Sequence, residues 1–153
     1  MGIRLDEDEI DDFLDKGHTL ILTTIDKDGY PHSTPLWFVY MDGLIYTRGR
    51  RRGQKTLNIQ RNPKVSCLVE EGDRWRDLKA VMIRGRAEEV TDPEEQARFQ
   101  KRDQKKYKKF REPQSNMPKA SQAHYSTPWI IFKIVSEKRS ATWDNKKIKL
   151  ATS

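Results

Sequence analysis

The sequence predicts a mainly β protein in which one antiparallel sheet closes, or nearly closes, into a barrel with flanking helices. Two observations lead to this prediction. Runs rich in apolar and β-branched residues recur along the chain, and turn residues separate them at the short spacings that are typical of hairpins. The 153 residues predict a single domain over 1–153, because a chain of this length can bury a sizeable core.

The first element is expected to be a helix over 6–16. Asp6 and Glu9 stand at the spacing of a capping box, and apolar residues recur on one helical face. Gly17 follows directly and can end the helix. The segment is acidic as well as amphipathic, so its polar face is expected to be strongly negative.

Strands are expected next at 19–25, 30–41 and 44–48. The first is rich in β-branched residues, and the turn sequence at 26–29 separates it from the second. Asp42-Gly43 then predicts a tight hairpin turn before the third strand. The remaining elements follow in order as a short helix at 54–63, strands at 64–70 and 78–90, a helix at 91–111, a polar connection at 112–127, and strands at 129–135 and 139–144. The sheet therefore contains six or seven predicted strands.

The charge of the chain favours an anionic partner. Lys and Arg outnumber Asp and Glu by 30 to 23, which gives a net charge of +7, but charge alone does not distinguish nucleic acid, membrane and phosphate ligands. Seven acidic residues within 6–15 would repel a phosphate backbone. No apolar run approaches the roughly 18 residues of a spanning helix, and one cysteine, Cys67, cannot form an internal disulfide. We therefore expect neither a nucleic-acid nor a membrane partner, and a cytoplasmic location.

The sequence contains no recognisable catalytic motif of its own. None of the three histidines forms a metal-ligand pair at helical spacing, so no metal site is predicted, and no serine stands in a nucleophile elbow. The stretch RGRRRGQK at 48–55 lacks the spacing of a Walker loop. If the protein is an enzyme, its reactive group is therefore expected to come from a cofactor, and its catalytic residues stay unassigned.

The same basic stretch predicts a phosphate site, because it lies between a strand and a helix that starts near Gln54. Backbone N–H groups at a helix start favour a bound phosphate, and Gly49 and Gly53 allow close approach of the backbone. Lys55 and one or more of the arginines 48, 50, 51 and 52 can add charge-assisted bonds. A solvated loop and a nucleic-acid contact remain the alternatives, and the basic helix at 98–111 is expected to present a mostly solvated face.

The order of the segments, rather than any one of them, carries a family resemblance. Four segments follow one another at 22–148: LTTIDKDGYPHSTPLWFVYMDGLIYT, QKTLNIQRNPKVSCLVEEGD, LKAVMIRGRAEEV and KRSATWDNKKI. Together they resemble the flavin-binding split-barrel superfamily, which includes the pyridoxamine-5'-phosphate oxidases and the deazaflavin-dependent oxidoreductases. The similarity extends over nearly the whole chain, from about residue 10 to about residue 150. The small reductases that use coenzyme F-420 are the most similar branch. The ending TWDNKK lacks the arginine-containing substrate motif of true pyridoxamine-5'-phosphate oxidases. We therefore do not expect the protein to oxidise vitamin B6.

The resemblance implies a six-stranded split β-barrel that forms a homodimer with two cofactor sites at the dimer interface. The implied activity is hydride transfer from coenzyme F-420 to an unsaturated or quinone-like molecule. An FMN-dependent oxidoreductase is the alternative, as is a module that binds a flavin or haem without turnover. The matching positions are Thr34, Pro35, Leu36 and Trp37 along the ring, Tyr46, Thr47 and Arg48 along the ring and ribityl chain, Arg52, Gln54, Lys55 and Asn58 around the phosphate, and Trp75 and Trp143 as aromatic residues that could close the site from either subunit.

Overall fold

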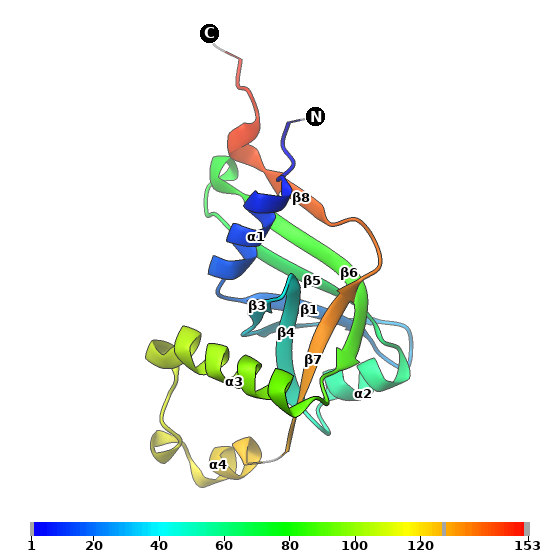
Figure 1. Cartoon of the computed structure of the whole chain (residues 1–153), viewed down its shortest axis with the longest axis vertical. Coiled ribbons are helices and arrows are strands. Elements are labelled where there is room, and N and C mark those ends of the chain that lie inside the picture. Colours follow the sequence, from blue (N-terminus) through cyan, green and yellow to red (C-terminus); the bar gives the residue numbers. More distant parts are fainter. Residues whose placement is uncertain (1, 127, 152–153) are drawn as a thin grey trace.

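The computed structural model describes residues 2–126 and 128–151, and these form one curled antiparallel sheet with helices around it (Figure 1). Along the sheet the strand order is β2-β1-β5-β6-β7-β4-β3, and β8 pairs with β6 beside this path. The predicted fold class, a mainly β protein with flanking helices, is confirmed. The strands are β1 (Leu20–Ile25), β2 (Pro31–Leu36), β3 (Val39–Met41), β4 (Leu44–Arg50), β5 (Lys64–Glu71), β6 (Lys79–Glu89), β7 (Trp129–Ser136) and β8 (Ala141–Asp144).

The two ends of this strand order lie close together, because β2 and β3 are consecutive in the chain. Only Trp37 and Phe38 separate them, and three steps between Cα atoms span at most about 11 Å. The sheet must therefore curl round until its first and last strands nearly meet. No pairing between β2 and β3 is found among the described residues, so the barrel is split at this point.

The expectation of one strand over 30–41 is wrong, because the chain leaves the sheet at Phe38. The Phe38 N–H donates to the Tyr107 hydroxyl at 3.0 Å, and its carbonyl accepts from Lys106 Nζ at 2.9 Å. Residues far along the chain thus satisfy this backbone in place of a neighbouring strand, while the Phe38 ring is fully buried. The break raises the described strands to eight, against six or seven from the sequence pattern and six from the resemblance.

One edge of β6 is shared by two strands. Residues 79–82 of β6 pair with β8 and residues 85–89 pair with β7, while β5 occupies the other edge. Gly85 lies where the second pairing begins, and a β-carbon there would overlap the Val135 carbonyl. Glycine therefore allows the backbones of β6 and β7 to approach closely.

The first helix begins where its capping residues predict. In α1 (Glu7–Lys16) the capping box is complete, since Asp6 Oδ1 accepts from the Glu9 N–H at 2.8 Å and Glu9 Oε1 accepts from the Asp6 N–H at 3.2 Å. The hairpin at Asp42-Gly43 is also confirmed, with φ of 55° and 73° as a type I′ turn requires. The short helix after β4 is α2 (Gln54–Arg61).

The basic helix is less solvated than expected. It forms α3 (Pro93–Tyr107), which begins at the capping residue Asp92. Phe99, Asp103 and Tyr107 recur every fourth residue and are all buried, so one complete face of the helix packs inward. Only the remaining faces match the predicted solvated surface.

The predicted polar connection at 112–127 is also more structured than expected, although residue 127 lies outside the described residues. It contains a short 3-10 turn at Gln114–Asn116 and the helix α4 (Lys119–Tyr125). None of the residues of α4 is buried. Figure 1 shows this segment below α3, at the end of the molecule opposite the two chain termini.

The main core fills the barrel, and a smaller apolar cluster lies between the sheet and α3. The described parts of the two termini are bonded to each other. The Asp144 N–H donates to the Ile3 carbonyl at 2.8 Å, and the Leu5 N–H donates to Thr142 Oγ1 at 3.0 Å. No helix in the described ranges has the length and apolar character needed to cross a membrane.

Candidate functional site

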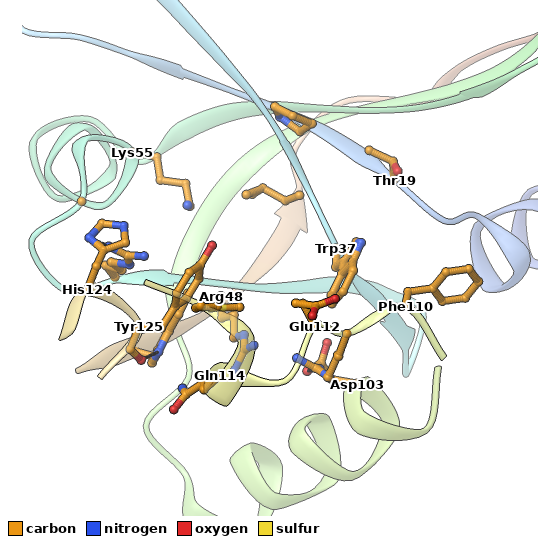
Figure 2. Close-up of a pocket in the computed structure, with 17 residues that line it drawn as sticks. Thr19, Trp37, Arg48, Lys55, Asp103, Phe110, Glu112, Gln114, His124 and Tyr125 are labelled. Atoms are coloured by element: carbon orange, nitrogen blue, oxygen red, sulfur yellow. Dashed lines mark hydrogen bonds and ion pairs between the residues drawn. The ribbon is translucent and has the colours of Figure 1, made fainter. Parts of the chain in front are cut away.

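A cleft of about 1000 Å³ opens between the start of α2, the strands β2, β4 and β7, and the segment that follows α3 (Figure 2). The volume is at the upper end of the range for small-molecule and cofactor pockets. Its walls combine aromatic rings with cationic side chains. It is lined by Thr19, Pro35, Leu36, Trp37, Arg48, Arg50, Gly53, Lys55, Asp103, Phe110, Arg111, Glu112, Gln114, Met117, His124, Tyr125 and Trp129.

At one end of the cleft the first turn of α2 presents unsatisfied donors. The helix begins after Gly53, which has no side chain to cap it. Within the described residues no acceptor is found for the N–H groups of Gln54, Lys55 and Thr56. A helix start of this kind carries a partial positive charge and free N–H groups, which together favour a bound anion.

Lys55 adds a full positive charge at the same end. Its side chain reaches into the cleft (Figure 2), and no carboxylate in the described part of the chain lies within ion-pair distance of it. The pKa of Lys55 is lowered, mainly because the side chain is buried and to a smaller extent because the positive charge of Arg50 is nearby. An ammonium group that has lost water and gained no counter-ion is stabilised by any anion that enters.

The aromatic wall beside this end holds two arginines. The Arg48 guanidinium lies 4.5 Å from the centre of the Trp129 ring, and that of Arg50 lies 5.0 Å from the centre of the Tyr125 ring. Arg50 also bonds to His124 Nδ1. Burial lowers the pKa of Arg48. Stacking of this kind holds a guanidinium in place while leaving its edge free to bind a ligand.

The opposite end of the cleft is built around Trp37. Its ring stacks on that of Tyr107, with centroids 4.4 Å apart and planes 6° from parallel. The Arg111 guanidinium lies 5.3 Å from the centre of the same Trp37 ring and forms an ion pair with Asp103. Figure 2 shows Trp37, Phe110, Asp103 and Glu112 together, on the side of the cleft away from Lys55, His124 and Tyr125.

The structure brings five of the predicted site residues together. Of the residues assigned from the resemblance, those that line the cleft are Pro35, Leu36, Trp37, Arg48 and Lys55. Thr34 precedes them on β2, and its hydroxyl oxygen is buried with no partner among the described residues. A buried hydroxyl without a partner is unusual in a folded protein.

Four further predicted residues are committed to the fold instead. Thr47 Oγ1 donates to the Trp37 carbonyl at 2.8 Å, so it helps to position that residue without lining the cleft. The buried Asn58 amide donates to Thr24 Oγ1 at 3.0 Å and accepts from Gln54 Nε2 at 2.8 Å. Tyr46 is buried and donates to Glu95 Oε2 at 2.6 Å, and its burial raises its pKa.

The last three predicted residues lie outside the cleft. Arg52 is exposed in the turn before α2. Trp75 is 56% exposed in a 3-10 turn before β6, and Trp143 lies on β8, opposite Ala80. Figure 1 shows β8 at the end of the molecule away from α4. Neither tryptophan closes the cleft of its own chain.

Sequence reasoning missed the residues that α3, α4 and β7 contribute. Asp103 carried a signal, since it continues the four-residue spacing of Phe99 and Tyr107 on the buried face of α3. Trp129 lies opposite Arg50 only through the β4–β7 register, which the sequence does not reveal. His124 and Tyr125 belong to a segment without apolar periodicity, so no pattern identified them.

Comparison with known proteins gives a family and several related structures. The family model described as pyridoxamine 5'-phosphate oxidase matches residues 6–128. A comparison with curated protein sequences gives no match. A conserved hypothetical protein of Mycobacterium tuberculosis is 30% identical, with 99% of this chain and 94% of that chain covered and a TM-score of 0.80.

Two further solved structures are more distant. An FAD-binding protein of Mesorhizobium loti is 24% identical, with 93% of this chain and 95% of that chain covered and a TM-score of 0.69. An F-420 reductase is 21% identical, with 86% of this chain and 94% of that chain covered and a TM-score of 0.62. These two likenesses establish the shared fold.

Proposed function

The chain belongs to the pyridoxamine 5'-phosphate oxidase family, and from this premise we propose that it is an oxidoreductase that binds coenzyme F-420 in the cleft. In this proposal a hydride passes to an unsaturated or quinone-like small molecule. FMN in the same cleft is the alternative cofactor. The resemblance to F-420-dependent reductases seen in the sequence supports the proposal, as does the F-420 reductase among the structures of the same fold.

The observation that carries the proposal is the uncompensated positive charge at the start of α2. Lys55 lines the cleft beside the first turn of α2, and among the described residues no anionic partner is found for the lysine or for the first-turn N–H groups. Both F-420 and FMN carry a phosphate on a ribityl chain, and a phosphate would satisfy these donors. The Thr34 hydroxyl, which has no partner among the described residues, lies on β2 next to the lining residue Pro35 and would be a further donor.

The preference for F-420 over FMN rests on the additional cations. Arg48 and Arg50 extend the positive lining beyond Lys55, and F-420 carries a polyglutamate tail that FMN lacks. More anionic groups on the ligand can then contact more arginines. Arg51 contributes less to this preference for F-420 than the sequence suggested. Its Nη2 lies 3.9 Å from Glu89 Oε1, and its side chain is largely exposed.

The residues of the chain would bind and orient the cofactor and limit water. Lys55 and the start of α2 would hold the phosphate, while Pro35, Leu36 and Trp37 would border the ring. The ring supplies the hydride when it is bound. Tyr125 and Trp129 stack on each other along one side of the cleft and would limit the access of water there. Tyr46 is a poor proton donor in this arrangement, since its hydroxyl is bonded to Glu95 and does not line the cleft.

We further propose that the protein acts in the cytoplasm as a homodimer with a cofactor site at each side of the interface. The positions of Trp75 and Trp143 support this arrangement. Both lie outside the cleft of their own chain, so they can contribute to a cofactor site only in the partner subunit. Trp75 is also one of the large exposed apolar side chains of the isolated chain.

An absorbance titration of the purified protein with F-420 and with FMN tests the proposal. Wild type and Lys27→Ala, which removes an exposed turn lysine, should bind F-420 more tightly than FMN. Lys55→Ala should weaken both by about ten- to a hundredfold, because charge-assisted bonds contribute about 1.5–3 kcal/mol. Reduced F-420 with menadione then tests turnover.

Three outcomes would count against parts of the proposal. If the protein binds neither F-420 nor FMN, the proposal that the cleft is a cofactor site is wrong. Equal or tighter binding of FMN would favour the alternative cofactor. Tight binding without any oxidation by menadione or by an α,β-unsaturated ketone would indicate a binding module instead of an oxidoreductase.

A further inference from the structure

The two ends of the cleft differ in charge balance. At the Lys55 end the lining residues that carry charge are all cationic, whereas both lining carboxylates, Asp103 and Glu112, lie at the Trp37 end (Figure 2). Arg111 joins them there through its contacts with Asp103 and Trp37. The described lining of the Trp37 end therefore holds two carboxylates against one guanidinium, so it carries a net negative charge, whereas the Lys55 end is cationic.

Arg111 is held in place from two sides. Its Nη2 pairs with Asp103 Oδ2, and its guanidinium lies against the Trp37 ring. The Asp103 side chain is only 7% exposed, so its negative charge is costly to bury and strongly favours a fixed cation beside it. Tyr107, four residues further along α3, fixes the Trp37 ring by stacking. The ion pair and the stacked rings thus orient Arg111 before any ligand arrives.

Arg111 nevertheless has donors that the protein does not satisfy. A guanidinium has five N–H donors, and in the described structure the Asp103 carboxylate is its one hydrogen-bonded partner. Its Nε is buried without an acceptor within the described residues. The side chain stays 32% exposed and lines the cleft. An acceptor that enters at this end therefore meets an oriented guanidinium.

The surroundings favour a carboxylate over a phosphate as that acceptor. Trp37 and Phe110 contribute aromatic surface to this end, which suits a planar apolar body. The fork of a guanidinium matches the two oxygens of a carboxylate. Asp103 and Glu112 would repel a doubly charged phosphate more strongly than a singly charged carboxylate. The opposite holds at the Lys55 end, where no lining carboxylate is present in the described chain.

We propose that the Trp37 end of the cleft is the substrate site and that Arg111 there recognises a carboxylate on a planar, apolar substrate. The inference rests on the proposed function, which assigns the Lys55 end to the phosphate of the cofactor. Asp103 is a positioning residue that acts through Arg111. The substrate class is therefore an unsaturated or quinone-like compound that carries a single carboxylate.

Calorimetric titration of the cofactor-free protein with naphthoate and with its neutral amide, naphthamide, tests the inference without turnover. The two probes have the same ring system and differ in charge. Wild type should bind naphthoate about tenfold or more tightly than naphthamide, as one charge-assisted bond implies. Arg111→Gln should reduce this ratio to about one. Arg102→Gln, a matched change at an exposed arginine of α3, should keep it.

Two further variants separate recognition from folding and from the other end of the cleft. Asp103→Asn/Arg111→Gln removes both charges of the ion pair and leaves no buried ion behind, and it should also lose the preference. Asp103→Asn alone keeps the guanidinium but frees it, so a smaller loss of preference should result. Lys55→Gln should keep the preference, because it alters the phosphate end only.

The inference is overturned if wild type binds naphthoate and naphthamide equally, or if Arg111→Gln keeps the preference. It is also overturned if Lys55→Gln alone abolishes the preference, because the carboxylate would then bind at the phosphate end. These outcomes are independent of the proposed function. A protein that binds naphthoate through Arg111 but neither F-420 nor FMN would retract the proposed function, while binding of a cofactor without any effect of Arg111 would retract the substrate site.

Discussion

Lys55 crosses directly over Gly49: a β-carbon on Gly49 would lie 2.8 Å from Lys55 Cε and 3.1 Å from Thr56 Oγ1. The Thr56 hydroxyl in turn donates to the Arg50 carbonyl at 2.5 Å. The last residues of β4 and the first turn of α2 therefore fit against each other with no room for a side chain between them. Because Gly49 has no side chain, the Lys55 stem can lie over it on its way to the cleft.

Gly49→Ala should therefore act through Lys55. The added methyl group must displace the lysine stem, and we expect the affinity for FMN and for F-420 to fall about tenfold, which is about 1.4 kcal/mol. Calorimetry measures the loss. In a Lys55→Ala background the same glycine change should cost little, because coupled residues give non-additive effects. Additive losses would show that Gly49 acts independently of the lysine.

The three arginines between Gly49 and Gly53 should contribute differently to the affinity for F-420, according to their positions. Arg50 lines the cleft, whereas Arg51 and Arg52 are exposed. Arg50→Ala should weaken F-420 binding about tenfold, and Arg51→Ala/Arg52→Ala should cost only a few tenths to about 1 kcal/mol, a loss that shrinks at high salt. Titrations at about 0.05 M and about 0.5 M salt distinguish screened from unscreened charges. A larger loss from the double change would place the polyglutamate tail outside the cleft.

Lys106 should make stability depend on pH. Burial lowers its pKa from 10.5 to about 8, while its Nζ donates to the Phe38 carbonyl at 2.9 Å. The unfolded chain binds this proton up to higher pH than the folded chain, so folding should gain stability as pH rises from about 8 towards 10.5. Urea unfolding at about pH 8 and about pH 10 should show less gain in Lys106→Met than in wild type. Lys105→Met, at an exposed neighbour, should behave like wild type.

The proposed dimer has a candidate contact surface on the outer face of the sheet. Ile21, Leu68 and Met82 are direct neighbours across β1, β5 and β6, and each is only partly buried. Covering such an apolar row favours association. Light scattering should give about twice the 18.0 kDa of one chain, and Leu68→Lys should shift the mass towards the monomer. A monomeric wild type at micromolar concentration would contradict the proposal.

Local signals in the sequence predicted most elements of the fold. The capping box at Asp6 and Glu9 and the turn at Asp42-Gly43 depend only on neighbouring residues, and both form as expected. The break at Phe38 could not be predicted in this way, because its backbone is satisfied by Lys106 and by a tyrosine 69 residues away. Long-range contacts of this kind overrule a continuous strand pattern.

In the candidate site, too, residues with a local role could be predicted from the sequence, whereas residues placed by long-range contacts could not. Lys55 was predictable because a basic residue directly after a glycine-containing loop and at a helix start has a local physical role. Arg111 was not, since its contacts with Trp37 and Asp103 require α3 to pack beside the break between β2 and β3. The end of the cleft with a mixed charge balance could therefore be recognised only from the packed structure.

Hydrogen bonds hold a segment near the start of the described chain beside a segment near its end. Because Asp144 bonds to Ile3 and Thr142 to Leu5, a linker could join the first described segment to the segment that follows β8, and both lie on the side of the molecule away from α4 (Figure 1). New ends could then be opened at the exposed turn formed by residues 27–29. Chain order and cleft geometry are in this sense separable, so a circularly permuted protein should assemble the same cleft from differently ordered segments.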